Sequence, residues 1–442
     1  MPRLSNAQNT RNVLILGAVG YVGSYWFEFM FPTLAVTLAS ATRLPLEEVL
    51  SWSFGSYLLF GLGALPAGFL GDRMGHRRVL VVALFALGVA ALAASEAPNG
   101  QVLVRSLALM GACASVFRPV SRSLIARTGD AGARGLRTLR VAGGAAIVIT
   151  PVLTAALCAR LGWQATYRVV GYAMCAIAIG SAFLGIDEPR AAGDGLVEPG
   201  ADAAPIGRHI GAREALLPLA ALVGAAMLAG VSYRGTVLVL PAYFAAHVTV
   251  FGFGIVTSFV YLLGVAGQYV GGWLAERQDP RRLYLLFHLL SLPALVLMTL
   301  LTDTPLIVSA AVFAVFNFGV QPIEDRLFTE LVPVRWRATA FGMRTALTIG
   351  VGALAVWLVD WAIASGGLSE SVLWLAGVVA LVAGASALLV RLEERSPRRT
   401  RLGVVPEAAT GPRGVRTVPA PVAALAINSA PPERRSPETS GR

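Results

Sequence analysis

The sequence contains no lysine and little charge of either sign. All 36 basic residues are arginine, and charged residues make up 14% of the 442 positions, against about 25% in soluble domains. A chain that is also 56% hydrophobic is too apolar for a soluble protein. The formal net charge of +11 would suggest a nucleic-acid binder in a soluble chain, so the apolar composition argues against that class. The absence of lysine fits both codon bias in a GC-rich genome and a preference for the guanidinium group.

Cysteine and catalytic motifs are also scarce. Cys113, Cys158 and Cys175 fall in apolar stretches without ligand spacing, so we expect neither disulfides nor a metal site. The sequence shows no P-loop and no Ser/His/Asp set, which leaves ATP-driven pumping and hydrolysis without support. We therefore expect no enzyme activity, no catalytic residue and no cofactor. The first apolar run is too long for a signal peptide and lacks a cleavage site, so we expect it to be a first membrane span.

Long apolar runs fill most of the chain. A membrane-spanning helix needs about 20 apolar residues, and windows of that length predict twelve helices. Their expected ranges are 13–39, 49–70, 79–95, 101–124, 139–159, 164–186, 216–245, 254–275, 283–302, 305–327, 338–360 and 369–391. We therefore expect an all-α membrane protein with twelve transmembrane helices.

One long polar stretch divides these helices into two groups of six. Residues 187–213 are expected to be a cytoplasmic linker between an N-terminal six-helix bundle, 13–186, and a C-terminal one, 214–392. Residues 1–12 are expected to be a cytoplasmic N-terminus. Residues 393–442 are rich in Pro, Arg, Ser and Glu, with too little apolar surface to fold. We expect a disordered, basic cytoplasmic tail.

The arginines predict the orientation of the chain. Short cytoplasmic loops collect positive charge, and most of the 36 arginines fall in segments that are cytoplasmic if the N-terminus lies inside. We therefore expect both termini in the cytoplasm and a multi-pass protein in the plasma or inner membrane, in a bacterium.

An internal repeat relates the two groups of helices. A shift of 204 positions aligns Tyr57 with Tyr261, Gly63 with Gly267, Gly68 with Gly272, Asp72 with Glu276, Arg73 with Arg277 and Arg77 with Arg281. Chance is a poor account of such a run at one fixed offset. The repeat predicts two homologous bundles related by pseudo-two-fold symmetry, as in one large class of transporters.

Two loops carry a resemblance to a known family. GFLGDRMGHRR, from Gly68 to Arg78, resembles the signature loop of the major facilitator superfamily, and GWLAERQDPRR, from Gly272 to Arg282, resembles its second copy. The resemblance implies the fold of that superfamily and a secondary active transporter that works by alternating access.

The resemblance also implies a cytoplasmic gate. The residues assigned to it are Gly68, Asp72, Arg73, Arg77, Arg140, Glu276, Arg277 and Arg344. Arg140 and Arg344 are repeat mates, as are Asp72 and Glu276. We predict the pairs Asp72–Arg344 and Glu276–Arg140, which would close the cytoplasmic side in the outward-open state and break when that side opens. The alternative is that these residues only satisfy topology and helix ends.

Polar residues at membrane depth point to a central cavity. The resemblance implies that helices 1, 4, 7 and 10 line it, and each carries a polar group there: Glu28, Arg118, Arg234 and Gln321 respectively. Such residues are costly in a membrane and call for a partner or a cavity. Tyr25 and Gln268 complete the candidate cavity set.

Glu28 is the candidate for proton coupling. It is the only acid well inside a helix of the first half, where burial disfavours its charge and an arginine favours it. The alternative is a static ion pair with Arg118 or Arg234. Together these two arginines favour an anionic or zwitterionic substrate, unless one of them only neutralises Glu28.

We therefore predict a proton-coupled transporter of a small organic solute, with export slightly favoured because the helix that carries Glu28 is rich in aromatic residues. The first alternative is uptake of an organic anion. An alternative of another class is a transporter-like sensor or assembly partner. The expected partners are the solute, protons and the lipid bilayer, with no nucleic acid, and the expected state is a monomer.

Overall fold

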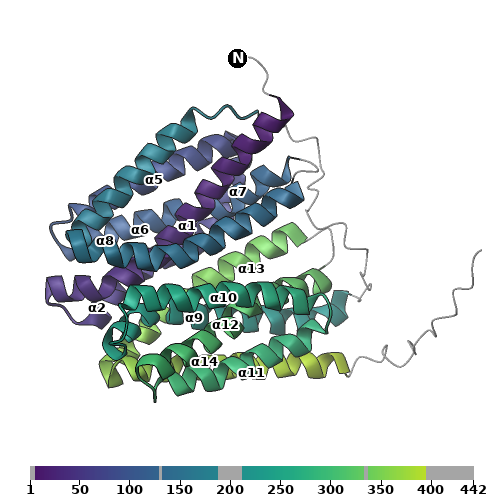
Figure 1. Cartoon of the computed structure of the whole chain (residues 1–442). Helices are drawn as coiled ribbons and strands as arrows, with labels where there is room; N and C mark the ends of the chain where they lie inside the picture. Colours follow the sequence, from purple (N-terminus) through teal and green to yellow (C-terminus); the bar gives the residue numbers. More distant parts are fainter. Residues whose placement is uncertain (1–4, 129–131, 188–211, 333–336, 395–442) are drawn as a thin grey trace, which may run out of the picture. The chain divides into compact units, whose positions relative to one another are not determined.

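A computed structural model describes residues 5–128, 132–187, 212–332 and 337–394. Within these ranges every regular element is an α-helix (Figure 1). The predicted tail and nearly all of the predicted linker lie outside the described residues.

The helices of the first half of the chain are α1 (Asn6–Thr42), α2 (Leu46–Ser51), α3 (Phe54–Leu62), α4 (Ala64–Met74), α5 (His76–Ser95), α6 (Gly100–Ala114), α7 (Phe117–Ala126) and α8 (Gly132–Ala182). Those of the second half are α9 (Ala212–His247), α10 (Phe253–Ala275), α11 (Pro280–Met298), α12 (Asp303–Leu331), α13 (Arg337–Gly352) and α14 (Ala355–Glu394). We call α1–α8 the first half and α9–α14 the second half.

Nine helices in the described part of the chain are long and apolar enough to cross a membrane. The number is ten if the segment from Leu46 to Leu62 (α2 and α3) and the helix α4, which meet at a bend, count together as one span. Two helices, α8 and α14, are interrupted by glycines with left-handed backbone, Gly162 at φ 81° and Gly367 at φ 82°. Glycine adopts this conformation without a steric penalty. As one straight helix the 51 residues of α8 would extend about 75 Å, more than twice the bilayer core.

The glycine breaks in α8 and α14 follow the internal repeat of the sequence. Gly162 and Gly367 lie 205 positions apart, one more than the offset that aligns the signature loops. The predicted all-α membrane fold is confirmed. The count of twelve, in which α8 makes two spans and α13 and α14 together make two more, stays a prediction, as do the domain boundaries.

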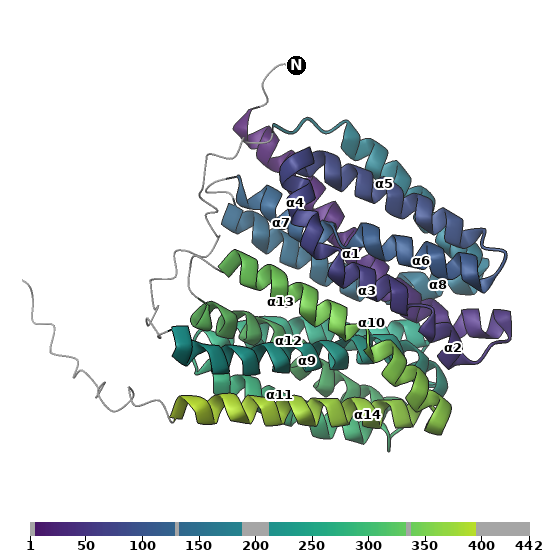
Figure 2. The ribbon, with the colours of Figure 1, turned by 180° about the vertical axis from the view of Figure 1, so that it is seen from behind.

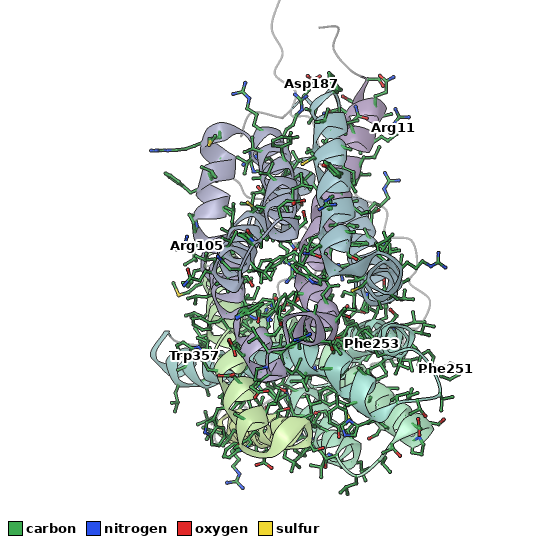
Figure 3. The ribbon with its side chains drawn as sticks, turned by 90° about the vertical axis from the view of Figure 1, so that its left-hand side faces the viewer. Arg11, Arg105, Asp187, Phe251, Phe253 and Trp357 are labelled. Carbon is green, nitrogen blue, oxygen red and sulfur yellow. The ribbon has the colours of Figure 1, made fainter. Side chains whose placement is uncertain are left out.

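The signature loop is a tight turn between α4 and α5. Gly75 has φ 88° and is both the C-cap of α4 and the N-cap of α5. We call the end of the molecule where this turn lies the signature-loop end. The N-terminal end of α1 belongs there too, because the Asn9 side chain donates a hydrogen bond to the Asp187 carbonyl at 2.9 Å. Figure 3 places Arg11 and Asp187 near the same edge.

Contacts between the halves gather toward the other end of the helices. The rings of Phe54 and Trp357 stack with centroids 4.3 Å apart, and the backbone N–H of Val152 donates to the Ser258 hydroxyl at 3.0 Å. Helix α13 packs against both α3 and α9 (Figure 2), with Gly61 directly against the backbone of Gly350. Any side chain at Gly61 would collide with that backbone, so the small residue allows close approach of the two helices.

Candidate functional site

A buried carboxylate joins the two halves of the chain. Glu28 lies in the middle of α1 and is 1% exposed. Its Oε2 accepts a hydrogen bond from Arg118 Nη2 of α7, and its Oε1 lies 3.0 Å from Arg234 Nη2 of α9. We call Glu28, Arg118 and Arg234 the central triad. Charge-assisted pairs of this kind are strong where water is excluded.

Arg118 is the more accessible arginine of the triad, with 21% of its side chain exposed. Its Nε donates to the Ser24 hydroxyl at 3.2 Å. Its guanidinium carbon lies 4.5 Å from the Tyr25 ring centroid and 5.1 Å from that of Phe60, both within range of a cation–π interaction. These contacts hold the guanidinium against α1 and the broken span of α3.

Arg234 is almost completely buried, at 2% exposure. Its guanidinium carbon lies 4.0 Å from the centroid of the Tyr57 ring, so a ring face covers one side of the group. Its Nε and Nη1 atoms are buried and have no hydrogen-bond partner among the described residues. Buried donors without acceptors are unfavourable, so these two nitrogens are available to an acceptor that the described part of the chain does not supply.

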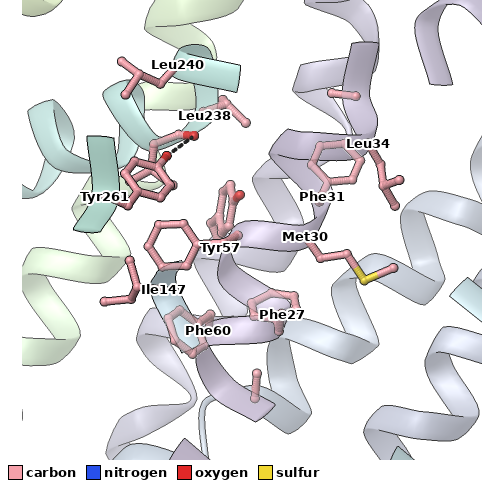
Figure 4. Close-up of a cluster of buried hydrophobic side chains, with 14 of the residues drawn as sticks. Phe27, Met30, Phe31, Leu34, Tyr57, Phe60, Ile147, Leu238, Leu240 and Tyr261 are labelled. Atoms are coloured by element: carbon pink, nitrogen blue, oxygen red, sulfur yellow. Dashed lines mark hydrogen bonds between the residues drawn. The ribbon is translucent and has the colours of Figure 1, made fainter. Parts of the chain in front are cut away.

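Prolines explain two further hydrogen bonds around the triad. Proline has no N–H and therefore leaves free the carbonyl four residues earlier in a helix. Pro32 frees the Glu28 carbonyl, which accepts from the Tyr57 hydroxyl at 3.4 Å. Pro241 frees the Val237 carbonyl, which accepts from the Tyr261 hydroxyl at 3.5 Å (Figure 4). Tyr57 and Tyr261 are repeat mates, so in both halves a tyrosine hydroxyl binds the carbonyl that a proline leaves free.

Aromatic side chains enclose this region. Phe27 packs against Phe60 at a centroid distance of 5.4 Å, and Phe29 of the first half meets Tyr261 of the second at 5.1 Å. Figure 4 shows Phe27, Tyr57, Phe60 and Tyr261 in one buried cluster. Such apolar packing keeps water away from Glu28 and Arg234 and strengthens the electrostatic contact between them.

The structure brings together four of the six predicted cavity residues: Glu28, Arg118, Arg234 and Tyr25. The other two pair with each other instead, because Gln268 Nε2 of α10 donates to Gln321 Oε1 of α12 at 3.1 Å. Sequence reasoning missed Ser24 and Phe60 as neighbours of Arg118. Ser24 could have been found, since it precedes Glu28 by four residues and so lies on the same helix face.

The predicted gate pair Asp72–Arg344 is not formed in this structure. Asp72 pairs with Arg127 at 2.6 Å and with His76 at 3.6 Å, both in its own half. Arg344 pairs with Glu324 at 2.8 Å and with Asp325, again within one half. Asp72 and Arg344 each have an oppositely charged partner within their own half, where the sequence predicted a partner from the other half.

The second predicted pair, Glu276–Arg140, is not formed either. The carboxylate of Glu276 lies 3.8 Å from Arg277, while Arg140 is exposed and forms no ion pair with the described residues. The guanidinium of Arg277 lies over the Trp273 ring at 4.3 Å. These groups sit at the surface of the signature-loop end, where water competes with ion pairs.

The remaining gate residues make contacts within the first half. Arg73 lies over the Phe69 ring at 4.5 Å, and Arg77 Nη2 donates to the Ala182 carbonyl at 2.6 Å. Gly68 faces open space. The first-half loop is therefore fastened to the end of α8.

The second half has a buried ion-pair cluster of its own. Glu324 is 4% exposed and accepts from the Tyr284 hydroxyl at 3.4 Å as well as from Arg344. The guanidinium of Arg344 lies over the Phe328 ring at 4.8 Å. We call Glu324, Asp325 and Arg344 the second-half cluster.

Metal ligation has no candidate in the part of the chain that the structure describes. No group of three His, Cys, Asp or Glu side chains is placed there to hold an ion. Cys113, Cys158 and Cys175 are free thiols.

The fold resembles several solved transporters. A bacterial homologue of the human lysosomal transporter Spinster, in an inward-facing and unoccupied conformation, superimposes with a TM-score of 0.75 at 15% identity, over 88% of this chain and 99% of that one. The nucleoside transporter NupG gives a TM-score of 0.71 at 13% identity, over 86% of this chain and 99% of the other. At such identities the likeness shows a common fold.

Two curated bacterial proteins match part of the sequence. The methylenomycin A resistance protein of Bacillus subtilis (strain 168) is 27% identical over 36% of this chain and 34% of its own length. The multidrug efflux pump LfrA of Mycolicibacterium smegmatis is 31% identical over 30% of this chain and 28% of its own length. The matches thus span about a third of each relative.

A family model covers nearly the whole chain. The description of the model is Major Facilitator Superfamily, and it matches residues 14–247 and 222–432. The match includes both signature loops and all three residues of the central triad. The resemblance seen in the loops is therefore confirmed, and the chain belongs to the Major Facilitator Superfamily, as a multi-pass membrane transporter and not an enzyme.

Proposed function

We propose that this chain is a proton-coupled secondary active transporter of a small organic solute and that Glu28 carries the proton. The observation that supports this is the position of the Glu28 carboxylate between Arg118 of one half and Arg234 of the other. Protonation would weaken both ion pairs at once. Proton binding would therefore change the contact between the halves at the depth where the solute binds.

Alternating access supplies the movement. The contacts that hold the halves together, such as Phe54 with Trp357 and Val152 with Ser258, lie away from the signature-loop end. This pattern supports an inward-open conformation, with the signature-loop end in the cytoplasm. In such a state the pairs Asp72–Arg344 and Glu276–Arg140 are expected to be open, and they stay predictions for the outward-open state. The arginine-rich loops favour a bacterial cell membrane and cytoplasmic termini.

Two directions of transport have support. Export is favoured by the names of the curated relatives, a resistance protein and an efflux pump. Uptake of an organic anion together with protons is favoured by the charge of the triad, which sets two arginines against one glutamate. The two directions share the site and differ in the substrate class.

The coupling role of Glu28 can be tested in proteoliposomes that hold the full-length protein. Uptake and counterflow of radiolabelled carboxylates and lipophilic cations would be measured with and without an imposed pH gradient. In Glu28→Gln we expect gradient-driven accumulation to fall to background while counterflow continues, because the site binds solute but no longer takes up a proton.

A matched control is Glu96→Gln, which removes an acid that pairs with Arg168 at the surface. This variant should behave as the parent protein does. Accumulation by Glu28→Gln at the parental level would exclude Glu28 as the proton carrier.

A further inference from the structure

Arg234 keeps two donor nitrogens that an acceptor can use. Its Nε and Nη1 groups are buried and have no hydrogen-bond partner among the described residues, while the third nitrogen, Nη2, lies 3.0 Å from Glu28. A guanidinium binds a carboxylate best through two parallel N–H groups. In a guanidinium the parallel N–H groups belong to Nη2 with Nε on one edge and to Nη2 with Nη1 on the other. Glu28 holds the nitrogen that both edges share, so a complete edge becomes available to another carboxylate when Glu28 lets go of Nη2.

The charge balance of the site also favours an anion. The charged and titratable groups that face Glu28 are Arg118, Arg234, Tyr25, Tyr57, Tyr233 and Tyr261. With the tyrosines neutral, the triad carries one positive charge when Glu28 is ionised and two when it is protonated. Excess positive charge in an apolar enclosure is costly unless it is paired. A cationic solute would raise this cost, and an anionic one would lower it.

We propose that the solute carries a carboxylate that binds the guanidinium groups of Arg118 and Arg234 in the place of the Glu28 carboxylate. Glu28 then acts as an internal substitute for the solute and holds both arginines while the site is empty. When Glu28 takes up a proton it lets go of the arginines, and the solute carboxylate takes its place between them. No covalent bond forms or breaks apart from the O–H bond of the Glu28 carboxyl.

Proton binding and solute binding therefore favour one another. By linkage, whatever factor the proton adds to solute affinity, the solute adds to proton affinity. This inference rests on the proposed function and selects the second of its two directions, because a proton and an anion that bind together also move together.

The binding experiment uses purified full-length protein in detergent, at equilibrium and without a membrane. The probes are benzoate, hexanoate and succinate, with benzamide and benzylamine as the neutral and cationic counterparts of benzoate. Ligand that binds the folded state raises the unfolding temperature, which the eight tryptophans report by fluorescence. Titrations at pH 6 and pH 8 give Kd, and each carboxylate probe stays at least singly ionised at both values.

We expect at least one of the carboxylates to stabilise the parent protein while benzamide and benzylamine do not. The affinity should rise as the pH falls, by at most about tenfold per pH unit for one coupled proton. In Glu28→Gln the affinity should be high at both pH values, because the competing carboxylate is gone.

Two arginine variants test the assignment of the site. Arg234→Gln should weaken carboxylate binding more than tenfold. Arg234→Lys keeps the charge and loses the parallel N–H groups, so its affinity should lie between those of the parent protein and of Arg234→Gln. Arg168→Gln changes an arginine that pairs with Glu96 at the surface and should leave Kd unchanged. If Arg234→Gln does not fold, Arg118→Gln carries the same expectation.

Three results would overturn the inference. They are stabilisation by benzylamine in place of the carboxylates, no stabilisation by any carboxylate, or carboxylate binding that is indifferent to both arginines. Failure of the proposed function has a different signature, namely pH-dependent carboxylate binding in detergent without proton-coupled flux in proteoliposomes.

Discussion

The two halves of the molecule neutralise their buried arginines in opposite ways. In the second half, Arg344 has two acids on the neighbouring helix α12, Glu324 and Asp325. In the first half, Arg118 pairs with a single acid among the described residues, Glu28, and it shares that carboxylate with Arg234 from the other half. A cluster completed within one half moves as a unit. A triad that spans both halves is sensitive to any change in their contact.

The repeat makes this difference easy to locate. At the offset of 204, the positions that correspond to Glu324 and Asp325 hold Val120 and Ser121. Arg140, the mate of Arg344, is therefore left exposed and without an ion pair among the described residues. Corresponding helix positions thus form a complete ion-pair cluster around Arg344 in the second half and leave Arg140 of the first half without an acid among the described residues.

The largest expected effect is on stability when an acid is removed from each arrangement. Glu28→Leu leaves two buried guanidinium groups with no acid, which should destabilise the folded state by about 3–5 kcal/mol. Glu324→Leu should cost less, because Arg344 keeps Asp325. Thermal unfolding of both variants, followed by tryptophan fluorescence in detergent, checks the order. Equal losses would mean that the triad and the second-half cluster are equivalent.

A smaller effect is expected from the two tyrosines that bind the proline-freed carbonyls. Tyr57→Phe and Tyr261→Phe each remove one hydrogen bond in the membrane, worth about 0.6–1.7 kcal/mol, so their unfolding temperatures should fall alike. Transport should separate them, because the carbonyl freed in the first half is that of Glu28. Gradient-driven flux is expected to drop in Tyr57→Phe and to stay near the parental level in Tyr261→Phe. Lower flux in Tyr261→Phe than in Tyr57→Phe would contradict a special role for the carbonyl of Glu28 in the first half.

The smallest effect is expected at the gate, where surface ion pairs contribute about 1 kcal/mol or less. Glu276→Gln should shift the balance of conformations more than Asp72→Asn does. Arg140 has no competing partner among the described residues, whereas Arg344 would have to leave Glu324 and Asp325 to reach Asp72.

Distances between spin labels at the signature-loop end would report the shift. The labels would be placed on a background without Cys113, Cys158 and Cys175, whose thiols are free. A larger shift in Asp72→Asn would show that the second-half cluster opens readily.

Much of the fold was predictable because the bilayer imposes a simple rule on sequence. Spans show as apolar runs, and the breaks at Gly162 and Gly367 fall between helices that the apolar windows had separated. The central triad was predictable for a related reason, since Glu28, Arg118 and Arg234 are ionisable groups in apolar surroundings and each needs a partner.

The ion pairs at the signature-loop end were not predictable to the same degree. Asp72 pairs with Arg127 and His76, whereas the sequence predicted Arg344, because sequence does not rank partners that lie on different helices. The hydrogen bond between Gln268 and Gln321 was not predictable for a similar reason. Two uncharged amides can bond to each other whenever the fold brings their helices together, and the sequence does not show which helices meet.

The charge count of the central triad has a consequence for the energy that drives the cycle. Empty, with Glu28 ionised between the two arginines, the site carries one positive charge. Loaded with a proton and a singly charged carboxylate, it would carry one positive charge again. The membrane potential does work only on charge that moves, so it would act equally on the loaded and the empty reorientation. A monocarboxylate would thus be carried electroneutrally, with the pH difference across the membrane as the force that concentrates it.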